Sequence, residues 1–208
     1  MRKPQDICPN CHSTQPQCLC DEIPRLNLTT RVCLVIHHRE LLRSSNTGLL
    51  ALRALVNSEM RVRGEGREGL DLVDLVASPY RTFLFYPAPD AVELTGELVR
   101  QSPVPIQLIV PDGTWRQASK VHYRQTELAG VPRVKIAKPD AVMYSLRAQH
   151  RPEGMATLQA IAHGLGVIEG DHVKAQLMQL YRAKLDRALA GRGLATGSAA
   201  VVKSRQTQ

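Results

Sequence analysis

Four of the five cysteines lie within thirteen residues near the start of the chain. Cys8, Cys11, Cys18 and Cys20 form the pattern C-x2-C-x6-C-x-C. Two close pairs of thiolates can surround one cation as a tetrahedron, which is the geometry that zinc prefers. Because four protein ligands leave no position open for substrate, we expect a structural zinc in a small knuckle over residues 1–25. Disulfides, redox use and uncoordinated thiols are the alternatives that the spacing leaves open.

A second group of candidate residues lies at the turn Asp112-Gly113-Thr114-Trp115. Asp-Gly pairs favour turns, and Thr114 with Gln117 three residues later fits a capping box that opens a helix. With Thr114 as the cap, Asp112 is expected to point outward beside exposed helix amides, and Gly113 admits a ligand close to the backbone. The alternative is that Asp112 only stabilises the turn and that Trp115 anchors the core.

The helix after this turn carries a stripe of positive charge. Arg116, Lys120 and Arg124 are spaced by four and therefore share one helical face. Residues 115–151 contain eight basic and two acidic side chains, whereas a solvated face usually mixes both signs. A stripe of one sign beside a turn suits a phosphate backbone, so we expect these three residues to bind RNA.

Four short runs rich in β-branched or aromatic residues predict the strands that position these side chains. They are Arg31–Ile36, Thr82–Tyr86, Ile106–Val110 and Arg133–Ala137, and Cys33 in the first run is expected in the core. Four sets of signals predict helices. Leu49, Leu52, Leu55 and Val56 share one helical face, and Asp90 with Glu93 is expected to cap a helix that carries Leu94 and Leu98. Gly130 and Pro132 are expected to end the helix that Thr114 opens, and a long helix is expected from Asp171 through Leu185.

Strands that alternate with helices predict an α/β domain over residues 26–190, with a largely parallel sheet flanked by helices. Ligands of such sheets bind at the carboxyl ends of the strands. His37 and His38 follow the first predicted strand, Pro87 follows the second and Asp112 follows the third. The candidate residues are therefore expected at one edge of the sheet.

The composition is that of a globular protein with a basic excess. The chain has 208 residues, of which 43% are hydrophobic and 22% charged, and its net charge of +8 favours a polyanionic partner. No apolar run approaches the roughly 20 residues that cross a bilayer, and no apolar leader precedes the cysteines, so we expect a cytoplasmic protein without membrane contact. Residues 191–208 are small or basic without a periodic apolar face, and this tail is expected to be disordered.

Five motifs, in this order along the chain, resemble those of the DTW-domain family. They are the cysteine cluster, Asn46-Thr47-Gly48, Asp112-x-Thr114-Trp115, Tyr144-x-x-Arg147 and Thr157-Leu158-Gln159-Ala160. Within that family, the chain resembles the bacterial tRNA-uridine aminocarboxypropyltransferases. It departs from the family pattern after His38, where a proline is expected, and at Ala156 and Gln159, where Ser and Glu are usual.

The resemblance implies a SPOUT-like fold with a trefoil knot. It also implies an enzyme that transfers the 3-amino-3-carboxypropyl group of S-adenosylmethionine to N3 of a uridine in tRNA and releases methylthioadenosine. Asp112 would be the general base that removes the N3 proton, in a catalytic turn with Thr114 and Trp115. The donor would be bound by Tyr86, Pro87, Gly113, Thr114, Trp115, Tyr144, Arg147 and Thr157, with Arg147 on the methionine carboxylate.

Three other functions stay open at this point. A SPOUT-type RNA methyltransferase would use the same donor but move its methyl group. A zinc-containing protein that only binds RNA would need no donor. A thiol redox enzyme would use the cysteines, although Cys8 and Cys11 lack the βαβ context of a redox pair. No obligate protein partner is evident.

Overall fold

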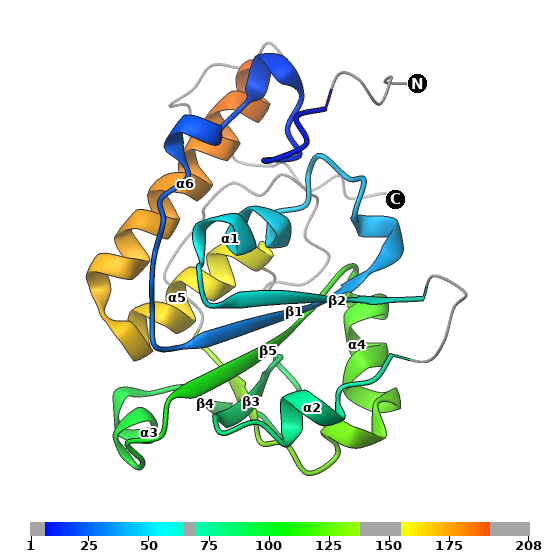
Figure 1. The fold of residues 1–208 in the computed structure, drawn as a ribbon, viewed down its shortest axis with the longest axis vertical. Helices are drawn as coiled ribbons and strands as arrows, with labels where there is room; N and C mark the ends of the chain where they lie inside the picture. The colour runs from blue at the N-terminus through cyan, green and yellow to red at the C-terminus, as the bar shows by residue number, and fades with distance from the viewer. Residues whose placement is uncertain (1–6, 65–69, 138–154, 192–208) are drawn as a thin grey trace, which may run out of the picture.

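The computed structural model describes residues 7–64, 70–137 and 155–191 (Figure 1). Its centre is a six-stranded, all-parallel sheet with the order β2-β1-β5-β3-β6-β4. The strands are β1 (Arg31–His37), β2 (Ser58–Arg63), β3 (Arg81–Phe85), β4 (Val92–Glu93), β5 (Ile106–Asp112) and β6 (Arg133–Lys135). The expected α/β class with a parallel sheet is confirmed, and all four predicted strands are present with small shifts at their ends.

Helices cover both faces of the sheet and form two cores. They are α1 (Gly48–Ala54), α2 (Val73–Val76), α3 (Gly96–Arg100), α4 (Trp115–Arg124), α5 (Thr157–Glu169) and α6 (Asp171–Ala190). In Figure 1, α1, α5 and α6 lie above the sheet and α2 lies below it. Val32, Leu34 and Ile36 of β1 pack in the core under α1, α5 and α6, whereas Cys33 and Val35 pack with α2 and α4. This alternation is the period of two expected for a strand that is buried on both faces.

The prediction that Asp90 and Glu93 open a helix is wrong. Glu93 belongs to β4, which pairs with β6, and the helix begins at Gly96. The helix is capped by Thr95, whose hydroxyl accepts a hydrogen bond from the amide of Leu98 (3.2 Å). Val92 and Glu93 therefore pair with the edge of β6 that β3 leaves open. The helix begins only after Thr95, the cap residue five positions after Asp90.

The helix opened by Thr114 is also shorter than predicted. α4 ends at Arg124, and residues Thr126–Leu128 form a separate turn of 3-10 helix, η5. Gly130 and Pro132 therefore close η5 and the turn after it rather than α4. Two elements lack a clear signal in the sequence: β2 alternates charged with apolar residues at the sheet edge, and α5 contains two glycines that lower its helix propensity.

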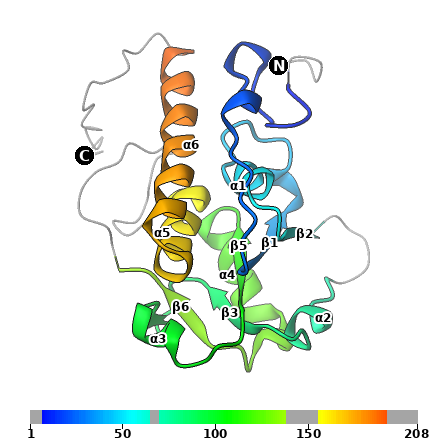
Figure 2. The same ribbon diagram turned by 60° about the vertical axis from the view of Figure 1, so that its left-hand side comes forward.

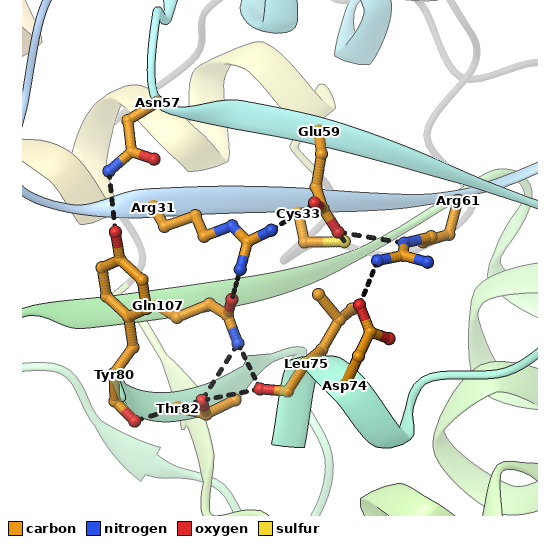
Figure 3. A network of polar contacts seen from close by, with 10 residues as sticks. All are labelled: Arg31, Cys33, Asn57, Glu59, Arg61, Asp74, Leu75, Tyr80, Thr82 and Gln107. Carbon is orange, nitrogen blue, oxygen red and sulfur yellow. Dashed lines mark hydrogen bonds and ion pairs between the residues drawn. The ribbon is translucent and has the colours of Figure 1, made fainter. Parts of the chain in front are cut away.

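The polar residues of β2 join a network on the face of the sheet that α2 covers (Figure 3). Arg31 pairs with Glu59 and donates to Gln107 Oε1 (3.2 Å). Arg61 donates to Glu59 Oε1 (3.0 Å) and to Asp74 Oδ2 of α2 (2.5 Å). The network connects three strands and α2, so the charged residues of β2 bind within the fold rather than marking a solvated loop.

The segment before β1 contacts α6 through Ser13 and Glu22, which bind Lys184 and Arg187 of that helix. α6 itself runs beside α5 (Figure 2). Leu19 and two cysteines share the core under α1, α5 and α6. The division into a knuckle (1–25) and a domain (26–190) stays a prediction. The expected disordered tail lies outside the described residues from 192 onward. Within the described ranges, no helix is long and apolar enough to cross a membrane.

The carboxylate of Glu169, at the end of α5, holds the start of β1. Its Oε1 accepts hydrogen bonds from Thr29 Oγ1 (2.9 Å) and from the amide (2.7 Å) and hydroxyl (2.5 Å) of Thr30. Because Thr30 is buried, Glu169→Ala should lower the free energy of unfolding by about 2 kcal/mol, measured by urea unfolding. Glu93→Ala, at an exposed position, is the control and should change it by less than about 0.5 kcal/mol. Equal effects of the two variants would contradict this role.

Candidate functional site

The Asp112 side chain lies at the carboxyl end of β5 and points into the fold. β5 continues through Asp112, which pairs with Ile36 of β1. The side chain therefore follows Leu108 and Val110 onto the face that α1 and α5 cover, and it is 5% exposed. The expectation that Asp112 points outward is wrong, because the residue is part of the strand and its direction is set by the strand's period of two.

Two donors hold the Asp112 carboxylate. Asn46 Nδ2 donates to Oδ2 (2.6 Å), and Thr157 Oγ1 donates to Oδ1. Both oxygens thus accept hydrogen bonds, as an ionised carboxylate does. Burial of a charge is costly unless it is hydrogen-bonded, and these two side chains are the donors that the described part of the chain supplies to stabilise it.

Gly48, the first residue of α1, gives the carboxylate its space. A Cβ at this position would lie 3.1 Å from Cγ and Oδ2 of Asp112, closer than real Cβ atoms normally approach. Asn46 is fixed in turn, because its Oδ1 accepts a hydrogen bond from the amide of Leu49 (3.0 Å). Asn46 had no predicted role, although the Asn46-Thr47-Gly48 motif was a signal that could have identified it.

The start of α5 completes the surroundings of the carboxylate. Thr157 is the first residue of this helix, and the amide of Leu158 donates to Thr47 Oγ1 (3.2 Å). Three motifs that lie far apart in the sequence therefore meet at Asp112. The structure brings Thr157, which was predicted to bind the donor, into contact with Asp112 and places Asn46 and Thr47 there as well.

The turn after Asp112 forms the predicted capping box. Thr114 Oγ1 accepts from the amide of Gln117 (3.3 Å), and Gln117 Oε1 accepts from the amide of Thr114 (2.8 Å). Gly113 has a φ of +148°, and a Cβ there would lie 2.9 Å from Gln117 Oε1. The position that a Cβ would take at Gly113 is thus next to the Gln117 side chain, and the expectation that Gly113 admits a ligand close to the backbone stays a prediction.

Four aromatic rings form a row from the start of α4 to its end. The half-buried Trp115 ring lies 6.3 Å from the Tyr86 ring, which follows β3. Tyr86 stacks on His122 (5.5 Å), and His122 contacts the edge of Tyr123 (4.3 Å). The predicted pair of Tyr86 and Trp115 is therefore brought together, with the exposed Pro87 next to it in sequence. The predicted Tyr144 and Arg147 lie outside the described residues.

The basic face of α4 is accessible. Arg116 and Arg124 are exposed and Lys120 is half-buried. Within the described residues none of the three forms an ion pair. Arg63 at the end of β2 adds a further positive charge near this face. Burial lowers the pKa of Arg63, and the charge of the nearby Arg124 lowers it further. Sequence patterns did not identify Arg63, because the strand that carries it was not predicted.

The histidine pair at the end of β1, His37 in the strand and His38 directly after it, lies beside the same charges. The rings of His37 and His38 are 4.8 Å apart, and His37 Nδ1 accepts a hydrogen bond from the amide of Arg39 (3.3 Å). Burial lowers the pKa of His37, and the neighbouring His38, Arg39 and Arg63 side chains lower it further. The His37 side chain is therefore a neutral acceptor at pH 7.

The four predicted metal ligands, Cys8, Cys11, Cys18 and Cys20, come together, and their Sγ atoms all lie within 4.8 Å of one another. The Cys8–Cys20, Cys8–Cys18 and Cys11–Cys18 sulfurs are 3.5, 3.7 and 3.8 Å apart. A tetrahedral zinc with bonds of about 2.3 Å separates its sulfurs by about 3.8 Å, so the set fits zinc. A disulfide needs about 2.05 Å, and all five cysteines are free.

Nitrogen donors surround this sulfur cluster. The amide of Leu19 donates to Cys11 Sγ (3.4 Å) and Asn10 Nδ2 donates to Cys20 Sγ (3.3 Å). Burial by itself raises the pKa of Cys11, but hydrogen bonds from the Leu19 and Ser13 backbone outweigh it and lower this pKa to about 6. The buried Lys184 of α6 donates to Ser13 Oγ (2.6 Å) and places a positive charge near the thiolates. Such outer donors orient and stabilise the ligands of a metal.

The match to a family model places the chain among known proteins. The model of the DTW domain matches residues 5–189, and the chain belongs to the DTW-domain family. Three curated relatives carry the name tRNA-uridine aminocarboxypropyltransferase 2. The Macaca fascicularis protein is 26% identical over 189 residues, with coverage of 88% of this chain and 62% of the relative. The Mus musculus protein is 28% identical over 175 residues (81% and 57%), and the Drosophila melanogaster protein is 29% identical over 169 residues (78% and 66%).

The chain thus spans about three fifths of the length of the relatives it matches. No solved structure matches it. The shared region includes the cysteine cluster, the Asp112 site and α4, because the family match runs from residue 5 to residue 189.

Metal analysis of the purified protein should find about one zinc per chain, as expected for four thiolate ligands. Cys18→Ser should remove most of the zinc and lower the thermal midpoint, because binding of a structural zinc is coupled to folding. The control is Cys33→Ala: Cys33 packs on the other face of β1, so this variant should keep its zinc. Full zinc content in the Cys18→Ser protein would contradict the assignment.

Proposed function

We propose that this protein transfers the 3-amino-3-carboxypropyl group of S-adenosylmethionine to N3 of a uridine in tRNA. The observation that carries the proposal is the meeting of three DTW-family motifs at one carboxylate, Asp112, at the edge of a parallel sheet where ligands bind. The names of the relatives, tRNA-uridine aminocarboxypropyltransferase 2, support the same reaction.

The reaction needs a base for the N3 proton of uracil. Asp112 is an acceptor on both oxygens and is fixed by Asn46 and Thr157, so it can take up that proton without reorganising. N3 then attacks the γ-carbon of the methionine moiety while the carbon–sulfur bond breaks. The electron pair of that bond neutralises the sulfonium and leaves methylthioadenosine, so no covalent enzyme intermediate is required. Because Asp112 is almost fully buried, little water competes for its lone pairs.

The remaining residues have binding or shaping roles in this proposal. Trp115 and Tyr86 offer half-buried ring surfaces to the adenine or the uracil, with Pro87 beside them. Thr114 and Gly113 form the turn that starts α4 beside the carboxylate. Tyr144 and Arg147 stay predictions from the motif, with Arg147 on the methionine carboxylate.

Three further features of the proposal stay predictions. The zinc is structural, since its four ligands leave no open position. The SPOUT-like, knotted topology rests on the family resemblance and on the parallel sheet, and the chain between β6 and α5 lies mostly outside the described residues. A cytoplasmic location follows from tRNA as the substrate.

Asp112→Asn tests the base directly. The amide keeps the size of the side chain but cannot take up the proton, so transfer should fall at least a hundredfold. Transfer is measured by incubation with S-adenosylmethionine and bulk tRNA followed by nucleoside mass spectrometry. Asp186→Asn, at an exposed site on α6, is the matched control and should transfer normally. Normal transfer by the Asp112→Asn protein would make Asp112 a purely structural residue.

A second pair of variants keeps this test clear if Asp112→Asn unfolds. Thr157→Val removes a donor to the carboxylate, whereas Thr157→Ser keeps it. We expect the Val variant to lose activity and the Ser variant to keep most of it. The by-product identifies the reaction: methylthioadenosine indicates aminocarboxypropyl transfer, and S-adenosylhomocysteine would indicate methylation instead.

The basic face of α4 should bind the phosphates of the tRNA. Replacing Arg116, Lys120 and Arg124 together with Gln should weaken tRNA binding and reduce the slope of log K against log salt by roughly 2 to 3, about 0.9 for each phosphate contact. Filter binding at several salt concentrations measures this slope. The control replaces three exposed arginines on other helices, Arg53, Arg100 and Arg182, and should leave the slope nearly unchanged. An unchanged slope in the α4 variant would rule the contacts out.

A further inference from the structure

A groove opens at the far end of α4, away from the Asp112 carboxylate. It has a volume of about 500 Å³, within the range of small-ligand sites. Its walls come from the loop after β3, the end of α4, η5 and β6. The lining residues are Pro89, Asp90, His122, Tyr123, Gln125, Thr126, Ala129 and Arg133. None of the residues assigned above to group transfer lines this groove.

Tyr123 is a large aromatic side chain that the fold does not use. Its side chain is 73% exposed, and it belongs to neither core. Its ring lies in a T-shaped contact with His122, which in turn stacks on Tyr86. An exposed ring supported from behind is the platform on which proteins stack unpaired nucleobases.

The polar groups of the groove suit a base better than a phosphate. Arg133 Nε donates to His122 Nδ1 (2.9 Å), and Arg133 Nη1 lies 3.4 Å from Asp90 Oδ2. Burial and Arg133 lower the pKa of His122, so its ring is neutral at pH 7 and its other nitrogen is a donor. The groove therefore combines donors from Arg133 and His122 with a mostly exposed acceptor, Asp90. A carboxylate repels phosphate, but it accepts hydrogen bonds from the amino and imino groups of bases.

The groove and the Asp112 site lie close enough together for one strand of RNA to contact both. Tyr123 lies eight residues after Trp115 on one helix, or about 12 Å along its axis. This equals three to four nucleotides at about 3.4 Å each. Lys120 lies three residues before Tyr123 and Arg124 directly after it, and neither forms an ion pair with another described residue. These two charges can hold the phosphates between the two sites.

We propose that this groove binds an unpaired base of the tRNA substrate, a few nucleotides from the modified uridine, by stacking on Tyr123 and hydrogen bonding to Arg133 and Asp90. The inference rests on the proposed function, because it takes tRNA as the ligand. It adds a base-binding subsite to the phosphate contacts of α4.

Tyr123→Ala and Tyr123→Phe test the subsite. The Ala variant should raise Kd and KM for bulk tRNA about tenfold, the effect of losing one stacked base, with a much smaller change in kcat. The Phe variant keeps the ring and should stay within about twofold of the natural protein. Stacking carries no charge, so the salt slope should stay unchanged, unlike the slope of the α4 charge variant. Val73→Ala, at another exposed apolar site, is the control.

Quenching of a single-stranded RNA that carries 2-aminopurine provides a second measurement. The natural protein and Tyr123→Phe should quench the probe, and Tyr123→Ala should not. Unchanged tRNA affinity in the Ala variant, a reduced salt slope or quenching that survives the Ala change would overturn the subsite. The proposed function fails separately: if no modified uridine forms while Tyr123 still controls tRNA affinity, the subsite stands and the transfer reaction does not.

Discussion

A buried carboxylate that must be hydrogen-bonded organises this protein. Asp112 continues the apolar face of β5, and a charge at that place is stable only with donors around it. Asn46 from the start of α1 and Thr157 from the start of α5 supply those donors, and Gly48 leaves the space. The requirement therefore fixes how two helices meet the central strand. It also explains why the three motifs are needed together: each provides part of the surroundings of one ionised side chain.

The features that sequence patterns predicted well are those decided by neighbouring residues. The capping box of Thr114 and Gln117 formed as expected, because both partners lie within one turn. The cysteine cluster assembled because its spacing is short. The direction of Asp112 was predicted wrongly, although Leu108 and Val110 on the same strand face carried the information. The predicted strand ended at Val110, so Asp112 was left out of that pattern.

Other features depend on contacts between distant segments and had no local signal. β2 carries the charged residues Glu59 and Arg61, which look solvated in sequence but bind Arg31 and Asp74 in the structure. The helix expected at Asp90 does not form there, because Val92 and Glu93 pair with the edge of β6 as a strand. The hydrogen bonds of Asn46 and Thr157 to Asp112 span 66 and 45 residues, and such pairs cannot be read from spacing.

The single helix α4 begins at the proposed chemistry and ends at the proposed RNA groove. An α-helix turns by about 100° per residue, so its length fixes both the separation and the relative direction of its two ends. Insertion of one residue in the middle of α4 would rotate Tyr123 and Arg124 by about 100° around the helix axis, while the end capped by Thr114 kept its position. The number of residues in α4 thus sets how far apart the two sites lie and how they face each other.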